Sequence, residues 1–420
     1  MNKKIISNSL WMMTEKLISI FGLIFVTSFV AKYIGPSVFG EIAFLTSLFQ
    51  IVQVISQLGS DVVIFKRIST NIKSGIILIN ATLQIRALVY FLFSIPVLLY
   101  ATIFNKVEGG EVYLYAVFIS LFISAMDLYS VYFDSVLKSK VNTLINLAGL
   151  VVSLVFRWAV AYFDCSPKLL AIPIVLATLI PLVIRVVIFN KEGLQLKRVS
   201  SRARIKYQKY LLKAGSTFVV SSISVTIYSK LSIIMLGFLT TSATVGIYSI
   251  SSTLAGAWSF VALSLITSSF PGIFSEKDEA IALTKVSNLS FITILVCLFF
   301  IICLYFFGSA FISLFYGVHY IAAFSPALIL SISTLFSLLG VIGSRFIAKY
   351  SGYLFLSKKS LAVTFLSISL NFFLIKRYGI FGAVYASLIT EIISLTLFNY
   401  LYNKGMLLKV HMRSFYYSKI

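Results

Sequence analysis

Apolar runs of about 20 residues recur from one end of this chain to the other, and they constrain its fold more than any other feature. Each run can cross a hydrocarbon core about 30 Å thick as a helix that rises about 1.5 Å per residue. Charged residues make up only 11% of the 420 residues, whereas a soluble domain has roughly 25%. The runs are continuous rather than alternating, which excludes a β-barrel. The sequence therefore predicts an all-α, polytopic membrane protein.

We predict twelve transmembrane helices in two groups of six. A basic stretch separates the groups, so we divide the chain into an N-terminal lobe (residues 1–190), a cytoplasmic linker (191–213) and a C-terminal lobe (214–420). The predicted spans are Leu10–Ile34, Glu41–Ile64, Ile76–Phe104, Val112–Val136, Thr143–Phe163, Leu169–Phe189, Ala214–Leu239, Val245–Phe270, Leu289–Phe307, Ala323–Phe346, Leu361–Ile375 and Ile380–Tyr402.

Lysine and arginine are distributed unequally between the two sides of this arrangement. The loops on one side, together with both termini, carry about 24 of these residues, and the loops on the other side carry about five. Cytoplasmic loops carry an excess of lysine and arginine, so both termini are predicted to be cytoplasmic. The same bias explains the net charge of +22, and nucleic-acid binding is not expected.

Corresponding turns in the two halves indicate an internal repeat. The first predicted hairpin turns through Tyr33–Ala43, and the seventh and eighth spans turn through Thr241–Ile250. Each turn places a glycine, Gly40 or Gly246, at the start of the following helix. Two groups of six spans have the same orientation, which predicts two lobes related by an axis along the membrane normal.

The residues that would support catalysis or metal binding are scarce. The three cysteines, Cys165, Cys297 and Cys303, have neither a disulfide pattern nor a zinc-ligand spacing. The two histidines, His319 and His411, are not part of a recognisable nucleophile–base pair. We therefore expect no catalytic residue, no metal and no cofactor.

Six cations fall inside the predicted spans, where a central charge costs roughly 2.5–3.5 kcal/mol on insertion scales. Arg86 and Lys230 are the deepest, each about 14–15 Å from the nearer helix end. They are expected to face protein or water rather than lipid. The other four lie nearer a helix end, where a long side chain can extend to the membrane surface. These four are Lys16, Arg157, Arg185 and Arg345.

Acidic residues in the spans leave several interpretations open. Asp127 lies at the depth of Arg86 on the next helix, so Arg86 is either a substrate-binding residue or one half of an Arg86–Asp127 ion pair. Glu391 lies in the middle of the twelfth span, where a carboxyl group suits proton exchange or hydrogen bonding to nearby hydroxyls. Glu15, next to Lys16, lies nearer the cytoplasmic surface and is a further candidate for ion coupling.

Five short motifs, in this order and spacing, resemble one known family. The chain is similar to the polysaccharide-transport branch of the multidrug/oligosaccharidyl-lipid/polysaccharide exporter superfamily, and most closely to the O-antigen flippases. The motifs are Y-I-G-P-S-V-F-G from Tyr33, L-G-S-D-V-V-I from Leu58, V-G-I-Y-S at Val245–Ser249, S-S-F-P-G-I at Ser268–Ile273 and Y-G-I-F-G-A-V-Y-A-S-L-I-T-E at Tyr378–Glu391.

The resemblance implies a monomeric transporter with two pseudo-symmetric lobes around a central cavity that opens alternately to each leaflet. It implies that the cargo is an undecaprenyl-pyrophosphate-linked oligosaccharide, moved to the periplasmic leaflet of the bacterial inner membrane. Membrane lipids and other O-antigen assembly proteins are the further partners implied. The candidates for binding the pyrophosphate are Lys230, Arg86, Arg157 and Lys16, and those for ion coupling are Glu391, Asp127 and Glu15.

One residue departs from the family pattern. Family members often carry an acid two residues after the position that matches Lys230, whereas this chain has Ser232. The departure removes a local ion-pair partner for Lys230 and favours contact between Lys230 and a pyrophosphate.

Two other functions remain as alternatives. A drug or cation exporter of the same superfamily would need an acidic cavity, whereas the deep charges here are cationic or balanced. A membrane polysaccharide polymerase or glycosyltransferase would need catalytic bases and a larger surface outside the membrane.

Overall fold

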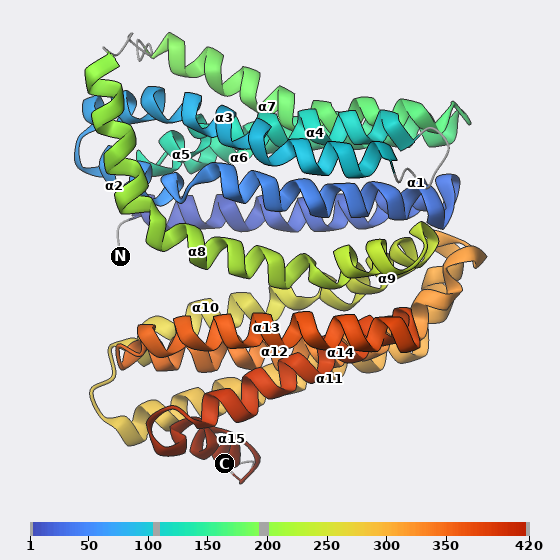
Figure 1. Ribbon diagram of the computed structural model, residues 1–420. Coiled ribbons are helices and arrows are strands. Elements are labelled where there is room, and N and C mark those ends of the chain that lie inside the picture. Colours follow the sequence, from blue (N-terminus) through green and yellow to red (C-terminus); the bar gives the residue numbers. More distant parts are fainter. Residues whose placement is uncertain (1–2, 104–109, 193–200, 417–420) are drawn as a thin grey trace. The chain divides into compact units, whose positions relative to one another are not determined.

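The computed structural model describes the backbone of residues 3–103, 110–192 and 201–416. It also describes their side chains, except those of residues 3–18, 20, 21, 23, 201–203, 213, 215–221, 404 and 414–416. Within these ranges the chain consists of helices joined by short turns, and the described residues form no strand (Figure 1). The predicted fold class, an all-α polytopic membrane protein, is confirmed.

The chain forms two compact units, which we call unit 1 (Met1–Ile227) and unit 2 (Tyr228–Ile420). The helix α8 (Ser201–Leu239) begins in unit 1 and ends in unit 2. The other helices of unit 1 are α1 (Lys3–Gln57), α2 (Ser60–Thr70), α3 (Ile72–Ile103), α4 (Gly110–Met126), α5 (Leu128–Ser135), α6 (Ser139–Tyr162), η1 (Pro167–Leu170) and α7 (Ala171–Lys191).

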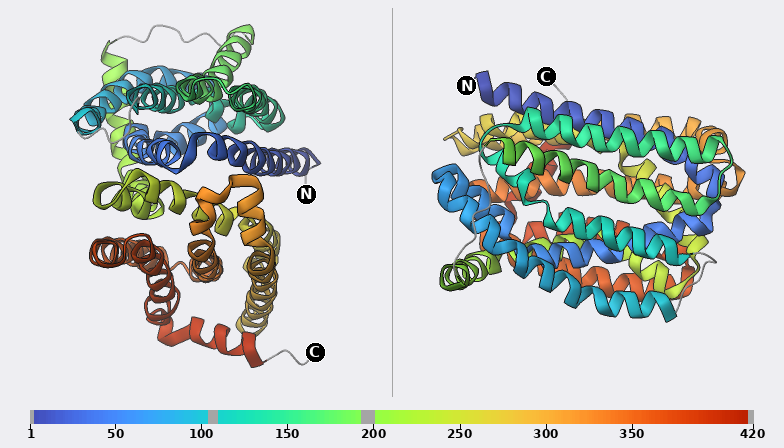
Figure 2. Two further views of the ribbon diagram at one scale, coloured as in Figure 1. Left: turned by 90° about the vertical axis from the view of Figure 1, so that its right-hand side faces the viewer. Right: turned by 90° about the horizontal axis from the view of Figure 1, so that it is seen from above.

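Unit 2 ends with a short helix that lies across its long helices (Figure 2). This helix is α15 (Met406–Tyr416), and it packs on α11. The preceding elements are α9 (Ser242–Ala257), α10 (Ser259–Phe274), α11 (Glu279–Phe311), η2 (Ile312–Tyr316), η3 (Val318–Ala323), α12 (Phe324–Lys349), α13 (Tyr353–Tyr378), α14 (Ile380–Ile393), η4 (Ser394–Phe398) and η5 (Asn403–Gly405).

Eleven helical segments of the described residues are long and apolar enough to cross a membrane. The first of them, Ile24–Gln57, extends across the boundary between the first two predicted spans. Gly35 interrupts it with φ 74° and ψ 171°, a conformation that glycine adopts readily, and Pro36 follows. The chain reverses direction there, so that the two parts of α1 lie side by side (Figure 1). The other ten segments correspond to the remaining ten predicted spans.

Two predicted spans are each divided into two helices by a polar side chain. In the fourth span Asp127 ends α4 and accepts a hydrogen bond from the backbone N–H of Ser130 in α5. In the eighth span α9 ends before Trp258, where the Ser259 hydroxyl donates to the Gly256 carbonyl at 2.6 Å. Such side chains compete with the helical hydrogen bonds of the backbone. The periodicity of apolar residues does not predict this competition.

Each unit has its own packed interior. In unit 1, α1 packs on α3, α4 and α6, and α7 packs on α4 and α6. In unit 2, α12 packs on α9, α11 and α14, and α13 packs on α14. The close approach of α13 and α14 depends on Gly382, because a Cβ atom there would lie 2.1 Å from the Leu374 carbonyl oxygen.

The substitution Gly382→Ala is therefore expected to destabilise unit 2 by about 1–3 kcal/mol, the typical cost of overpacking. Thermal unfolding of the purified protein in detergent would measure the effect. Gly272→Ala is the matched control, since a Cβ atom at Gly272 meets nothing within 4 Å. Equal unfolding temperatures for the two variants would contradict the expected close contact.

Candidate functional site

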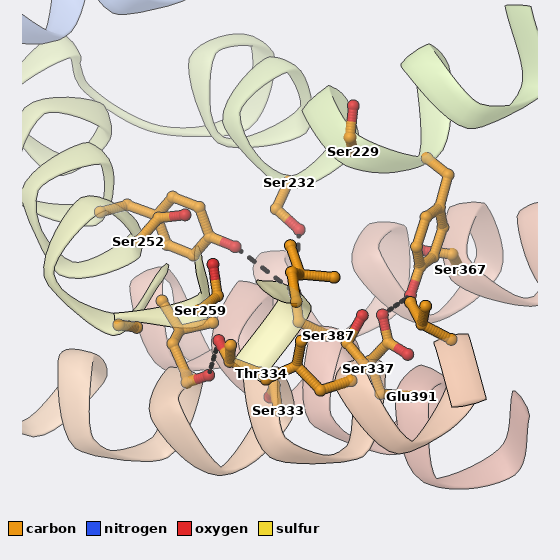
Figure 3. Close-up of a pocket in the computed structure, with 17 residues that line it drawn as sticks. Ser229, Ser232, Ser252, Ser259, Ser333, Thr334, Ser337, Ser367, Ser387 and Glu391 are labelled. Atoms are coloured by element: carbon orange, nitrogen blue, oxygen red, sulfur yellow. Dashed lines mark hydrogen bonds between the residues drawn. The ribbon is translucent and has the colours of Figure 1, made fainter. Parts of the chain in front are cut away.

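A polar cavity of about 310 Å³ lies inside unit 2, among α8, α9, α10, α12, α13 and α14 (Figure 3). Most of its lining side chains carry hydroxyl groups, and Glu391 is the one charged residue among them. We call this space the hydroxyl cavity. It is lined by Tyr228, Ser229, Ser232, Tyr248, Ser252, Ala255, Ser259, Leu263, Leu330, Ser333, Thr334, Ser337, Leu338, Val341, Ser367, Ser387 and Glu391.

Glu391 is held in the hydroxyl cavity by neutral groups. Its carboxylate accepts a hydrogen bond from the Tyr228 hydroxyl and also interacts with the Ser337 side chain (Figure 3). Glu391 lies near the end of α14, directly before the π-helical turn Ser394–Phe398. Turns of this kind are frequent at functional sites. The structure therefore places Glu391 among hydroxyl groups. The sequence did not identify several of these serines and threonines as residues of a site.

Ser232 links three helices at the wall of the hydroxyl cavity. Its hydroxyl donates to Asn371 Oδ1 at 2.9 Å and lies 3.2 Å from Ser387 Oγ. The Tyr248 hydroxyl lies 3.4 Å from the same Ser387 oxygen. These contacts join α8, α9, α13 and α14 through neutral groups. Ser232 is neutral, and Glu391 is the one carboxylate that lines the cavity.

The hydroxyl cavity offers oxygen atoms only: one carboxylate and a surrounding set of hydroxyls. Oxygen ligands suit hard cations, and a carboxylate can alternatively take up a proton. Among the described residues no three His, Cys, Asp or Glu side chains gather in a way that would hold a metal ion. The arrangement therefore suits exchange of one proton or one monovalent cation.

Arg86 forms an ion pair, but not with Asp127, the partner that one of the two sequence interpretations gave it. Its side chain is buried in unit 1 and forms an ion pair with Asp61, not with Asp127. Its Nε atom donates to Ser60 Oγ at 2.9 Å, and one terminal nitrogen donates to the Ala125 carbonyl at 2.7 Å. The prediction matched Arg86 and Asp127 by depth, but depth does not determine which way a side chain points around the helix axis.

Asp127 is instead the partner of Arg185. Arg185 was expected to extend to the cytoplasmic surface, but its side chain is buried in unit 1 and forms an ion pair with Asp127. Its Nε atom donates to Asn142 Oδ1 at 2.7 Å, and a terminal nitrogen donates to the Asn146 side chain. The two asparagines lie four residues apart on α6, a spacing that could have indicated a buried polar face.

Two of the predicted substrate-binding cations have no carboxylate partner among the described residues. Lys230 and Arg157 are both half-buried, and neither takes part in an ion pair there. Lys230 does not line the hydroxyl cavity. At 100° per residue it lies on nearly the opposite face of α8 from Tyr228 and Ser232. The side chains of Lys16 and Glu15 lie outside the described residues.

One buried cation was missed because the predicted eleventh span begins too late. Lys359 was assigned to a cytoplasmic loop, but it lies within α13 and is only 9% exposed. Its ammonium donates to Asn399 Oδ1 at 2.7 Å. The charge of Lys359 also acts on Glu391, so a cation lies near the hydroxyl cavity without lining it.

Comparison with known proteins gives a family and a fold. A model of the polysaccharide biosynthesis protein family matches residues 5–277. The structure is similar to a lipid II flippase, MurJ, in an inward closed conformation, with 14% identity and a TM-score of 0.70 over 98% of this chain and 91% of that one. A search of curated proteins gives no match.

Two MATE transporters have a similar structure. One is a MATE family transporter of the MOP superfamily in an inward-facing conformation, with 13% identity and a TM-score of 0.65 over 100% of both chains. The other is the Vibrio cholerae MATE transporter VcmN in the bent form, with 15% identity and a TM-score of 0.53 over 97% of this chain and 99% of that one. At these identities the similarity establishes the fold alone.

The Arg185–Asp127 pair should be essential for the stability of unit 1. Arg185→Met leaves a buried carboxylate without its cation and is expected to destabilise the protein by about 3–5 kcal/mol in thermal unfolding. Arg345→Met is the control, because Arg345 contacts the Thr267 hydroxyl at 3.3 Å and forms no ion pair among the described residues. The double variant R185M/D127N should regain part of the loss. A double variant less stable than R185M would contradict the pairing.

Proposed function

The chain belongs to the polysaccharide biosynthesis protein family, and we propose that it is a flippase for undecaprenyl-pyrophosphate-linked O-antigen repeat units. The cargo passes from the cytoplasmic to the periplasmic leaflet of the bacterial inner membrane by alternating access. The observation that carries this proposal is the family match together with a fold similar, over 98% of the chain, to that of a lipid II flippase. We infer the class of substrate from these relatives.

Unpaired cations inside the membrane support a pyrophosphate-binding role. A pyrophosphate needs positive charges to replace its hydration, and a cation already paired with a carboxylate is less available for this purpose. Lys230 and Arg157 have no carboxylate partner among the described residues, whereas Arg86 is paired with Asp61. We therefore place Lys230 and Arg157 first in the proposed binding set, which also includes Arg86 and Lys16.

We assign ion coupling to Glu391. Its carboxylate lies in a cavity of hydroxyl groups, where uptake of a proton or a monovalent cation would neutralise its charge. Asp127 is less suited to this role, because its charge is already balanced by Arg185. Glu15 remains a proposed site on sequence grounds.

The proposed arrangement in the membrane follows the sequence. Both termini lie in the cytoplasm, and the two lobes comprise residues 1–190 and 214–420 with the basic linker 191–213 between them. Other O-antigen assembly proteins are the proposed partners. The transporter performs no covalent chemistry in this proposal.

Drug export is the second candidate function, because the fold is also similar to that of a multidrug resistance MATE family transporter. A cationic drug would be recognised by acidic groups. Glu391 is the one acid lining the hydroxyl cavity, and a volume of about 310 Å³ is at the lower end for a drug site. Drug resistance that depends on this chain, without any effect on lipid-linked sugars, would favour this function over flipping.

We expect Lys230→Ala to fail to restore O-antigen display in a strain from which this gene has been deleted. That strain should accumulate lipid-linked repeat units on the cytoplasmic leaflet. Loss of a charge-assisted contact worth about 1.5–3 kcal/mol corresponds to a rate reduced about tenfold to a hundredfold. Lys230→Arg should keep part of the activity, and Lys358→Ala, at an exposed lysine of unit 2, should keep all of it. Full display by a membrane-inserted K230A protein would exclude Lys230 from binding.

We expect Glu391→Gln to uncouple transport from its ion gradient. Glutamine has the same size and can still accept a hydrogen bond from Tyr228, but it cannot take up a proton or provide a negative charge. In reconstituted vesicles the variant's transport rate should fall to the rate measured without a gradient. Glu276→Gln, in the exposed loop between α10 and α11, is the control. Unchanged dependence on the gradient in E391Q would remove Glu391 as the coupling site.

A further inference from the structure

A second cavity lies in unit 1 between α2 and the first part of α8. Its volume is about 360 Å³, and its wall combines two cations with apolar and hydroxyl-bearing side chains. We call it the basic groove. The residues that define it are Val62, Lys66, Arg67, Thr70, Tyr210 and Ala214.

The basic groove has a firmly packed base. Val63, Ile64 and Ile68 of α2 are buried in one apolar cluster with Leu211 of α8. The side chain of Gln208, one turn before Leu211, donates to the Ala81 carbonyl of α3 at 3.1 Å. These contacts fix the first part of α8 against α2 and α3, so the groove is a feature of the folded unit.

The two cations of the basic groove are not neutralised by the protein. Lys66 and Arg67 are exposed, and neither forms an ion pair among the described residues. Asp61, one to two turns earlier on α2, is already paired with Arg86. Elsewhere Lys138 and Lys285 each bind a glutamate, at 2.6 and 2.7 Å. The charge of the basic groove is therefore available to an external anion.

The position of the basic groove matches the level of lipid head groups. The candidate span before α2 ends at Gln57, and the predicted seventh span begins at Ala214 in α8. The groove residues lie at or just outside these two limits, on the side that the distribution of lysine and arginine predicts to be cytoplasmic. Val62 and Tyr210 are each 50% exposed, so apolar surface borders the cations.

We propose that the basic groove binds the head group of an anionic phospholipid from the cytoplasmic leaflet. Lys66 and Arg67 pair with the phosphodiester, and the lipid's glycerol and upper acyl carbons lie against Val62 and Ala214. Basic pockets beside transmembrane helices favour anionic lipids in this way. A free phosphate ion would leave the apolar wall uncovered. A volume of about 360 Å³ suits a phosphoglycerol group better than a pyrophosphate with several sugars.

Native mass spectrometry of the full-length protein, titrated with phosphatidylglycerol or phosphatidylcholine, tests this proposal. The wild-type protein should bind phosphatidylglycerol more tightly than phosphatidylcholine. The double variant K66A/R67A should bind phosphatidylglycerol about thirtyfold more weakly, given the contribution expected of two cations near a membrane surface. The matched control is K73A/K191A, which removes two exposed cations of the same unit that do not line the groove. Gel filtration checks that both variants are folded.

Three outcomes would overturn the proposal. Equal weakening in K66A/R67A and K73A/K191A would show that general charge, not the groove, attracts the lipid. Displacement of phosphatidylglycerol by millimolar inorganic phosphate would identify the groove as a site for a free anion. A K66A/R67A variant that loses binding of undecaprenyl pyrophosphate but keeps that of phosphatidylglycerol would make the transported lipid the occupant. None of these measurements depends on flipping, so they stand apart from the proposed function.

Discussion

A charge inside the bilayer must be compensated by the protein, and unit 1 compensates the buried Arg86 and Arg185 with opposite charges. Desolvation of an isolated ion is so costly that a buried charge needs a partner or access to water. Arg86 is paired with Asp61, and Arg185 is paired with Asp127. Each guanidinium also donates to neutral oxygens on neighbouring helices. Removing one member of the buried Arg185–Asp127 pair costs about 3–5 kcal/mol. Together the two networks connect α2, α3, α4, α6 and α7.

Unit 2 compensates its buried charges with neutral groups. The Glu391 carboxylate is held by a tyrosine hydroxyl, and the Lys359 ammonium is held by the Asn399 amide oxygen. Within the described spans of unit 2 no carboxylate is paired directly with a cation. A hydrogen bond to a charged group contributes about 1.5–3 kcal/mol, less than the cost of breaking a buried ion pair. Glu391 can therefore exchange its partner at a lower cost than Asp127, which supports the proposed assignment of ion coupling to Glu391.

Hydropathy predicted the helical spans well. It could not predict where a helix breaks within a span, or which acid pairs with which buried arginine. Apolar length determines where a chain can cross a membrane, and the spans of the structure follow that pattern. The breaks at Asp127 and Trp258 depend instead on single side chains that bond to the backbone. The partner of Arg86 depends on rotation about the helix axis, which depth along the helix does not specify. Lys359 was misassigned because a hydropathy pattern ends where a helix becomes polar, although the helix itself continues.

The hydroxyl cavity shows how far the sequence could identify a site. Glu391 could be recognised as unusual from its place in an apolar span, and Ser232 from a missing acid. The sequence did not show that Ser232 and Glu391 are connected through Ser387. Ser387 lies one turn before Glu391 on α14, and its hydroxyl lies 3.2 Å from that of Ser232. One face of α14 therefore joins a neutral network to the cavity's single carboxylate. Because that carboxylate carries one negative charge, one proton or one monovalent cation is enough to neutralise it, whereas a divalent ion would leave a positive charge among hydroxyl groups.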